Sequence, residues 1–155
     1  MPAPHIFSET EARRSMMRTL AQARDSELQS VLAVLHPLPV FADLRPPEVG
    51  LVMVRGRIGG DGQPFNLGEA TVTRAAVRLE SGETGFSYLL GRHPETARLS
   101  ALIDALWQRQ QSRPLIESRV LAPLRERQAQ EATQQRAKTA ATKVDFFTVA
   151  RGEDE

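Results

Sequence analysis

The sequence predicts a single α+β domain: an N-terminal helical hairpin, an antiparallel sheet of about four strands, a covering helix and an extended C-terminal helical arm. Three observations lead to this fold class. Between residues 40 and 92, glycine-rich turns alternate with β-branched and apolar runs, as in an antiparallel meander. On either side of that segment, apolar residues recur at helical spacing. The chain has 155 residues, about the size of one domain, so we expect residues 1–155 to form one unit.

Residues 1–36 are predicted to form a hairpin of two short helices. Ser8 and Glu11 have the spacing of a capping box, which marks the start of the first helix. A second helix begins at about Asp25 and ends before Pro37, because a proline disfavours helix at the residue before it. Each helix has one apolar stripe, which we expect to pack on the sheet.

Residues 40–92 are predicted to form the meander. Val40–Asp43 is a short edge strand that two prolines close, and Leu51–Ile58 is a stronger strand. The turn Gly59–Gly62 then reverses the chain into a strand that ends at Leu79. One more turn leads into a last strand at residues 85–90.

Residues 94–113 are predicted to form the helix that packs on the sheet. Pro94 suits the first turn of a helix, and a strong apolar stripe includes Leu102, Leu106 and Trp107. Alanines recur every four residues beside that stripe, so another element can approach closely there.

Residues 115–155 are predicted to form a C-terminal arm with an apolar tail. Pro123 suggests a break or kink near Ala122. From residue 125 to 143 the chain is polar and helix-prone, so that helix depends on propensity and side-chain pairs. The tail either covers its own sheet edge or docks on a partner, and we favour the partner because the preceding helix is so polar. The candidate interface residues of the tail are Val144, Phe146, Phe147 and Val149.

The composition argues against several classes of function. The formal net charge is +1, so nothing in the overall charge indicates binding to nucleic acid or to an anionic membrane. The absence of cysteine excludes a disulfide, a thiol nucleophile and a thiolate-bound metal cluster. The first residues lack the features of a signal peptide, and no apolar run approaches membrane-spanning length. We therefore expect a cytoplasmic protein.

The sequence contains no recognisable catalytic or metal-binding set. His5, His36 and His93 share no metal-ligand spacing, and the last two precede prolines, which favours structural roles. Asp104 is expected to be a solvated carboxylate on the polar side of its helix. Spacing alone identifies no Ser-His-acid triad. We predict that this chain supplies no catalytic residue and holds no metal.

The turn at residues 59–62 is a candidate phosphate-binding loop because clustered backbone N–H groups bind anions. It lacks the Gly-Lys-Ser/Thr ending of a P-loop and leads into a strand instead of a helix. We therefore interpret it as a hairpin turn.

Arginines of the predicted sheet are better candidates for binding an anion. In the expected register, Arg55, Arg57, Arg74 and Arg78 share one basic face, unless a bulge near Gly68 switches the faces. Four such side chains can bind a polyphosphate. The alternative is that they pair with Glu69, Glu80 or the carboxylates of a partner, or are solvated.

Five stretches of the sequence share residues with one known family. They are 57–62, 66–79, 85–92, 102–106, and 144–148 with Arg151-Gly152. Together they resemble PhnG, the small G subunit of the bacterial carbon–phosphorus lyase core complex. The resemblance runs in order from about Leu20 to Gly152. No common structural motif supplies both the Thr-Arg-Ala-Ala-Val-Arg-Leu strand and the Val-Asp-Phe-Phe-Thr tail.

The resemblance implies a non-autonomous subunit of an alpha-D-ribose 1-methylphosphonate 5-triphosphate synthase. With its partners, chiefly the large nucleosidase-like I subunit, it would take part in displacing adenine from ATP by an alkylphosphonate such as methylphosphonate. ATP would be a substrate of the complex, and this chain would bind no cofactor. We predict triphosphate contacts at Arg74 and Arg78 first, then at Arg57 and Arg92. The alternatives are a purely structural assembly subunit without substrate contact and an enzyme active by itself.

Overall fold

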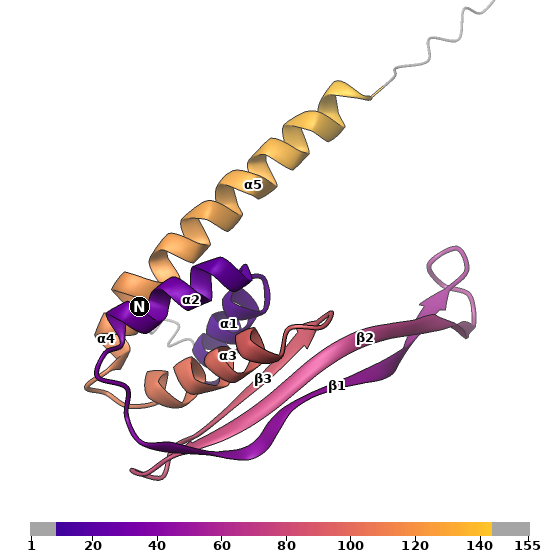
Figure 1. The fold of residues 1–155 in the computed structure, drawn as a ribbon. Coiled ribbons are helices and arrows are strands. Elements are labelled where there is room, and N and C mark those ends of the chain that lie inside the picture. Colours follow the sequence, from indigo (N-terminus) through magenta and orange to yellow (C-terminus); the bar gives the residue numbers. More distant parts are fainter. Residues whose placement is uncertain (1–8, 144–155) are drawn as a thin grey trace, which may run out of the picture.

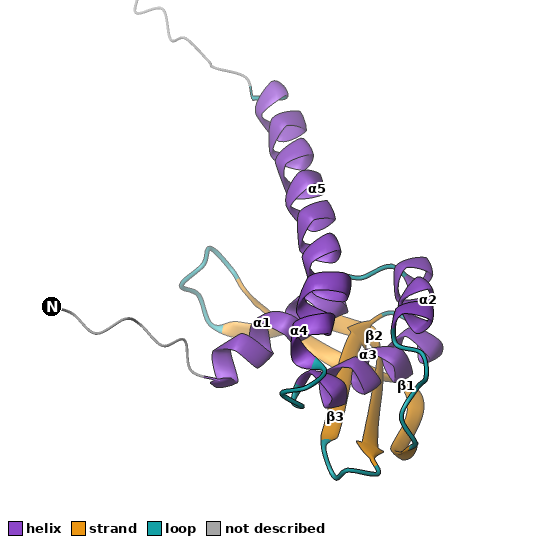
Figure 2. Ribbon diagram, turned by 90° about the vertical axis from the view of Figure 1, so that its left-hand side faces the viewer, coloured by secondary structure: helices purple, strands orange, loops and turns teal. Residues whose placement is uncertain are grey.

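The computed structural model describes residues 9–143, which form one α+β domain with a projecting helix (Figures 1 and 2). A three-stranded antiparallel sheet has the strand order β1-β2-β3. The helices lie on one side of this sheet, and its other face has no helix over it in Figure 1. The predicted capping residue Ser8 and the predicted apolar tail lie outside the described residues.

The sheet has three strands instead of about four, because two of the predicted strands are parts of one continuous strand. The segments at 40–43 and 51–58 belong to a single long strand, β1 (Phe41–Arg57). Register shifts on either side of Arg45 allow Pro46 and Pro47 to remain in the strand. This is possible because β1 is an edge strand, where a missing backbone donor is tolerated.

The other two strands are β2 (Pro64–Leu79) and β3 (Thr84–Leu90). Because β3 pairs only with residues 72–78 of β2, β1 and β2 continue past it as a two-stranded ribbon. A further register shift lies where Val54 pairs with Gly68 and Arg55 pairs with Asn66. This irregularity lies where the sequence analysis allowed for a bulge.

The N-terminal helical hairpin is present and packs mainly on a helix, not on the sheet. Its helices are α1 (Glu9–Ala21) and α2 (Asp25–Val34). The backbone N–H of Arg24 donates to the Glu27 carboxylate at 2.8 Å, which fixes the start of α2. Both helices contact α3 (Pro94–Trp107), and α1 also reaches β3. The apolar stripes therefore form a second helical layer above α3.

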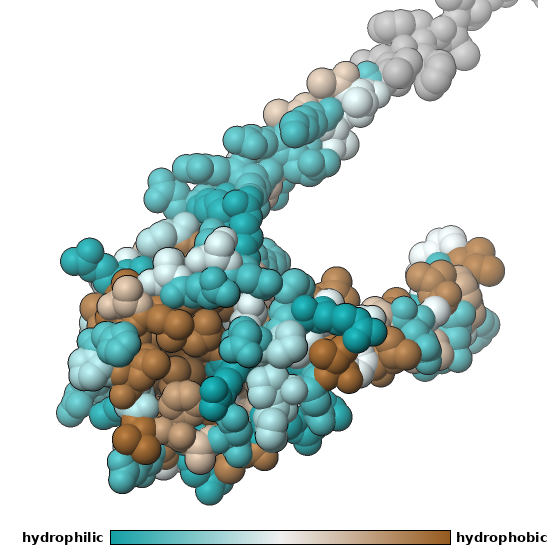
Figure 3. All heavy atoms as spheres, in the orientation of Figure 1, coloured by the Kyte–Doolittle hydropathy of each residue, from teal (hydrophilic) through white to brown (hydrophobic). Residues whose placement is uncertain are grey.

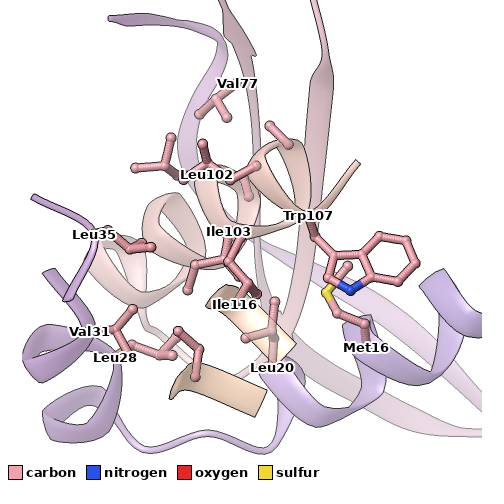
Figure 4. Close-up of a cluster of buried hydrophobic side chains, with 14 of the residues drawn as sticks. Met16, Leu20, Leu28, Val31, Leu35, Val77, Leu102, Ile103, Trp107 and Ile116 are labelled. Atoms are coloured by element: carbon pink, nitrogen blue, oxygen red, sulfur yellow. The ribbon is translucent and has the colours of Figure 1, made fainter. Parts of the chain in front are cut away.

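The central helix α3 contributes more buried apolar residues to the core than any other element, and Figure 4 shows several of them. Ile103 and Trp107 meet Met16 of α1 and Ile116 of the later short helix there. The predicted alanine-lined contact is with β3: a Cβ on Gly85 would lie 1.9 Å from the Ala101 carbonyl oxygen. Only glycine allows this close approach of strand and helix.

The C-terminal arm is helical from Arg113 to Ala141. It consists of α4 (Arg113–Ile116), a π-helical turn η1 (Glu117–Leu121) and α5 (Ala122–Ala141). The irregularity predicted near Ala122 is therefore a π-helical turn directly before Pro123, where an α-helical hydrogen bond is lost. Leu124 is the buried residue of α5, and the helix is exposed from Ala129 to its end.

Asp104 is the centre of the contact between α1, α3 and β3. It is fully buried, so the prediction of a solvated carboxylate was wrong. Arg13 of α1 donates to both carboxylate oxygens, Nε to Oδ1 at 2.8 Å and Nη2 to Oδ2 at 2.7 Å. The backbone N–H of Phe86 on β3 donates to Oδ2 at 2.8 Å. The hydrogen bond to Asp104 raises the pKa of the Arg13 guanidinium, so this guanidinium stays charged.

Replacing Arg13 with methionine should lower the free energy of unfolding by about 3 kcal/mol, because a buried carboxylate would lose its counter-charge. Urea unfolding followed by circular dichroism measures the change. The control is Arg14→Met, an exposed arginine on the same helix, for which we expect a loss below about 0.5 kcal/mol. Equal losses for the two variants would show that Arg13 contributes nothing beyond its place on the helix.

Candidate functional site

The strand β2 separates a buried set of residues from an exposed basic set. Thr73, Ala75, Val77 and Leu79 are buried on the side of α3. Arg74 and Arg78 are exposed on the opposite side, which no helix of residues 9–143 covers. This alternation is the one predicted from the sequence, and it follows from the period of two along a strand.

Arg74 belongs to a cluster of charges on the helix-free face. Its Nε donates to Oε1 of Glu48, the residue that it pairs with on β1. Arg45 donates to the same oxygen at 2.6 Å. The hydrogen bond from Arg74, and then that from Arg45, lowers the pKa of Glu48. Arg74 is thus paired with a carboxylate of its own chain, as in the alternative interpretation of the sequence. The partner is Glu48, however, and not Glu69 or Glu80.

The four predicted triphosphate ligands do not converge. Arg78 lies opposite Thr84 at the start of β3, with Nε 3.5 Å from its hydroxyl. Arg92 follows the other end of that strand, about 23 Å away at the rise of an extended chain. Arg57 lies at the end of the ribbon, where Nη1 donates to the Gly62 carbonyl at 3.2 Å.

The prediction that Arg55 and Arg57 share a face with Arg74 and Arg78 was wrong. In the ribbon, Met53 pairs with Glu69, and Leu51 pairs with Thr71, so odd positions of β1 meet odd positions of β2. Arg55 and Arg57 share the face of Met53, opposite the face of Arg74. Pairing register cannot be read from one strand at a time, and a shift of one residue exchanges the two faces.

The helix-free side of the sheet also carries exposed apolar side chains. Phe86, Tyr88 and Leu90 of β3 are 49%, 51% and 73% exposed. Val54 and Phe65 continue this face along the ribbon, where the Phe65 ring lies against Gly56. We call these five residues, with Arg45, Glu48, Arg74 and Arg78 beside them, the open sheet face. Figure 3 shows apolar side chains along the projecting ribbon.

The glycine turn is a hairpin turn, as predicted. It joins β1 to β2, and the N–H of Gly62 donates to the Ile58 carbonyl at 3.0 Å. Gly59 and Gly60 have positive φ values of 66° and 88°, which glycine adopts without strain. The backbone of residues 59–62 thus closes a turn between two strands.

A second polar cluster joins α2 to the start of α3. Thr96 donates its hydroxyl to Asp25 at 2.6 Å, and Nδ1 of His93 lies 3.2 Å from the same carboxylate. The bond from Thr96, followed by that from His93, lowers the pKa of Asp25. The backbone N–H of His93 also donates to Thr73 Oγ1 at 3.0 Å, which supports the structural role predicted for this histidine.

Two surface cavities border α1, and the sequence analysis missed both. One, of about 620 Å³, lies between α1 and β3 and is lined by Met17 and Tyr88. The other, of about 570 Å³, lies between α1 and the start of the C-terminal arm. Arg14 and Arg18 line both cavities. The sequence signal that could have indicated these cavities is the spacing of Arg14 and Arg18, because residues four apart lie on one face of a helix.

Residues 9–143 contain neither a cluster of metal ligands nor a membrane-spanning helix. No group of three or more histidines, cysteines or carboxylates in that range could hold a metal ion. Within the same range, no helix has the length and apolarity needed to cross a membrane.

The fold and the site define a small α+β protein, in which the described helices cover one face of the sheet and leave the other open. A family model described as "Phosphonate metabolism protein PhnG" matches residues 11–152, so the chain belongs to the PhnG family. A curated relative from Rhizobium meliloti (strain 1021) is 50% identical over 145 residues, which cover 92% of this chain and 90% of that protein. That relative is named alpha-D-ribose 1-methylphosphonate 5-triphosphate synthase subunit PhnG.

Replacing Thr96 with valine should raise the pKa of Asp25 towards the ordinary value of about 3.9, because the main hydrogen bond to the carboxylate is lost. Titration of the Asp25 carboxyl carbon by NMR measures this. The stability that this bond contributes should be present above pH 4 or so and disappear as the pH falls through the lowered pKa. The control is Thr133→Val on the exposed helix α5, which should leave the pKa of Asp25 unchanged. An unchanged pKa of Asp25 in the Thr96 variant would show that the Thr96 hydroxyl does not lower it.

Proposed function

We propose that this chain is a non-autonomous subunit of an alpha-D-ribose 1-methylphosphonate 5-triphosphate synthase. Together with its partner subunits it would displace adenine from ATP by an alkylphosphonate, giving ribose 1-alkylphosphonate 5-triphosphate. The proposal is supported by the relative of that name, which is 50% identical over almost the whole chain. The structural observation that carries the proposal is the open sheet face. Large apolar side chains that are this exposed are typical of a surface that binds protein partners.

The partners that we propose are the other subunits of the carbon–phosphorus lyase core complex, chiefly the large nucleosidase-like I subunit. ATP is a substrate of the complex in this proposal, and the chain itself needs no cofactor. The reaction would take place in the cytoplasm. The predicted tail residues, from Val144 to Val149, are proposed as a further partner contact.

Two versions of this function differ in the role of the arginines. In the first, Arg74 and Arg78 are counter-charges to the triphosphate, with Arg57 and Arg92 as weaker candidates. In the second, the chain is a purely structural subunit and its arginines serve protein interfaces. The pairing of Arg74 with Glu48 and the wide separation of the four arginines favour the second version.

Omitting this chain from a complex reconstituted from the other subunits should abolish adenine release from ATP and methylphosphonate. Chromatography of the released adenine measures the reaction. The chain alone should release none, since we propose that it acts only with partners. Full activity of the complex without this chain would contradict the proposal, and activity of the purified chain alone would establish an autonomous enzyme instead.

Changing both Arg74 and Arg78 to glutamine tests the two versions. In the structural version, the intact complex keeps its KM for ATP within about twofold. Loss of even one charge-assisted contact to the triphosphate, about 1.5–3 kcal/mol, would raise the KM at least tenfold. The measurement is the ATP dependence of adenine release at protein concentrations where the complex remains assembled, and a tenfold rise would support the substrate-binding version.

A further inference from the structure

We propose that the open sheet face binds an apolar, carboxylate-bordered surface on another subunit of the synthase. This inference rests on the proposed function and adds to it the surface and the chemistry of the partner. The contact would be made by Phe86, Tyr88 and Leu90 on β3 and by Val54 and Phe65 on the ribbon. Arg74 and Arg78 would lie at its margin.

The ribbon lacks support from the rest of the described chain. Beyond the pair Val72–Leu90, β1 and β2 have no third strand, and Figure 1 shows no helix over them. A two-stranded ribbon is marginally stable in water by itself. On the open sheet face the ribbon nevertheless exposes two large apolar side chains, which are Val54 at 37% and Phe65 at 41%. A partner that covers it would remove this surface from water and add stability.

The size of the face fits a protein and not a small molecule. Phe86 pairs with Ala76, and from Ala76 to Phe65 the strand β2 extends over about 35 Å at the usual rise per residue. A typical protein interface buries about 800 Å² on each side, which corresponds to a patch of roughly 30 Å across. A nucleotide would contact only a fraction of such a length.

The charges of the face favour a different protein over a second copy of this chain. Arg45, Arg74 and Arg78 are accompanied by the carboxylate of Glu48 and, beside Arg78, by that of Glu80. Three positive charges against two negative ones leave the face with a small net positive charge. Two copies in a two-fold contact would bring these positive margins together, which is unfavourable. A partner with carboxylates around an apolar centre complements the face in both respects.

The test uses the full-length chain and the other synthase subunits purified without it. Leu90→Glu and Phe65→Glu each place a carboxylate on the proposed contact, at positions that are already exposed. We expect each variant to bind the other subunits at least tenfold more weakly in isothermal titration. Arg78→Glu should also weaken binding, and the effect should shrink as salt is added.

The controls carry the same substitutions away from the face. Leu115→Glu on α4 and Arg119→Glu on η1 are exposed positions on the helical side. We expect these two variants to bind within twofold of the unchanged chain. Unfolding midpoints of all five variants should agree, which separates loss of contact from loss of fold.

Three results would overturn the inference. The first is binding of the face variants to the other subunits as tight as that of the controls. The second is a dimer of the chain alone in sedimentation that Leu90→Glu dissociates, which would assign the face to a second copy. The third is normal assembly of the face variants with a loss of affinity for ATP only. In each case adenine release could still require the chain, so the proposed function would stand while this inference failed.

Discussion

The bidentate ion pair between Arg13 and Asp104 is the interaction on which the arrangement of the helices depends. It joins the first helix to the central helix, and the same carboxylate accepts the Phe86 N–H of β3. A buried charge without a counter-charge is costly, so α1 can leave this position only at a large energetic cost. The pair therefore orients three elements that are far apart in the sequence, while the apolar contacts around Trp107 and Met16 supply most of the burial.

The consequence of this arrangement is a strongly one-sided sheet. With α1 and α2 stacked on α3, all helical cover is used on one face, and α5 leads away from the sheet (Figure 1). The other face holds the exposed residues of β3 and the paired charges around Glu48. Arg74 on β2 and Phe86 on β3 are thus part of the same surface.

Local patterns predicted much of the fold. The alternation from Thr73 to Leu79 indicated which side chains of β2 are buried, and Pro94 marked the start of α3. Properties that depend on distant pairing were not predictable in the same way. The burial of Asp104 required knowledge that Arg13, 91 residues away, would lie beside it. The separation of Arg57 from Arg74 required the register between β1 and β2, and the continuous course of β1 through Pro46 and Pro47 required knowing that it is an edge strand.

The exposed part of α5 acts as a rigid spacer. The last contacts of this helix with the helical hairpin are made near Arg127 and Glu131, which bind Glu27 and Arg24. Ten further residues carry the helix to Ala141, about 15 Å beyond those contacts at the rise of an α-helix. A flexible linker of that length would sample many distances and directions. The helix instead fixes both, so whatever is joined to its end starts from a defined point in space relative to the sheet.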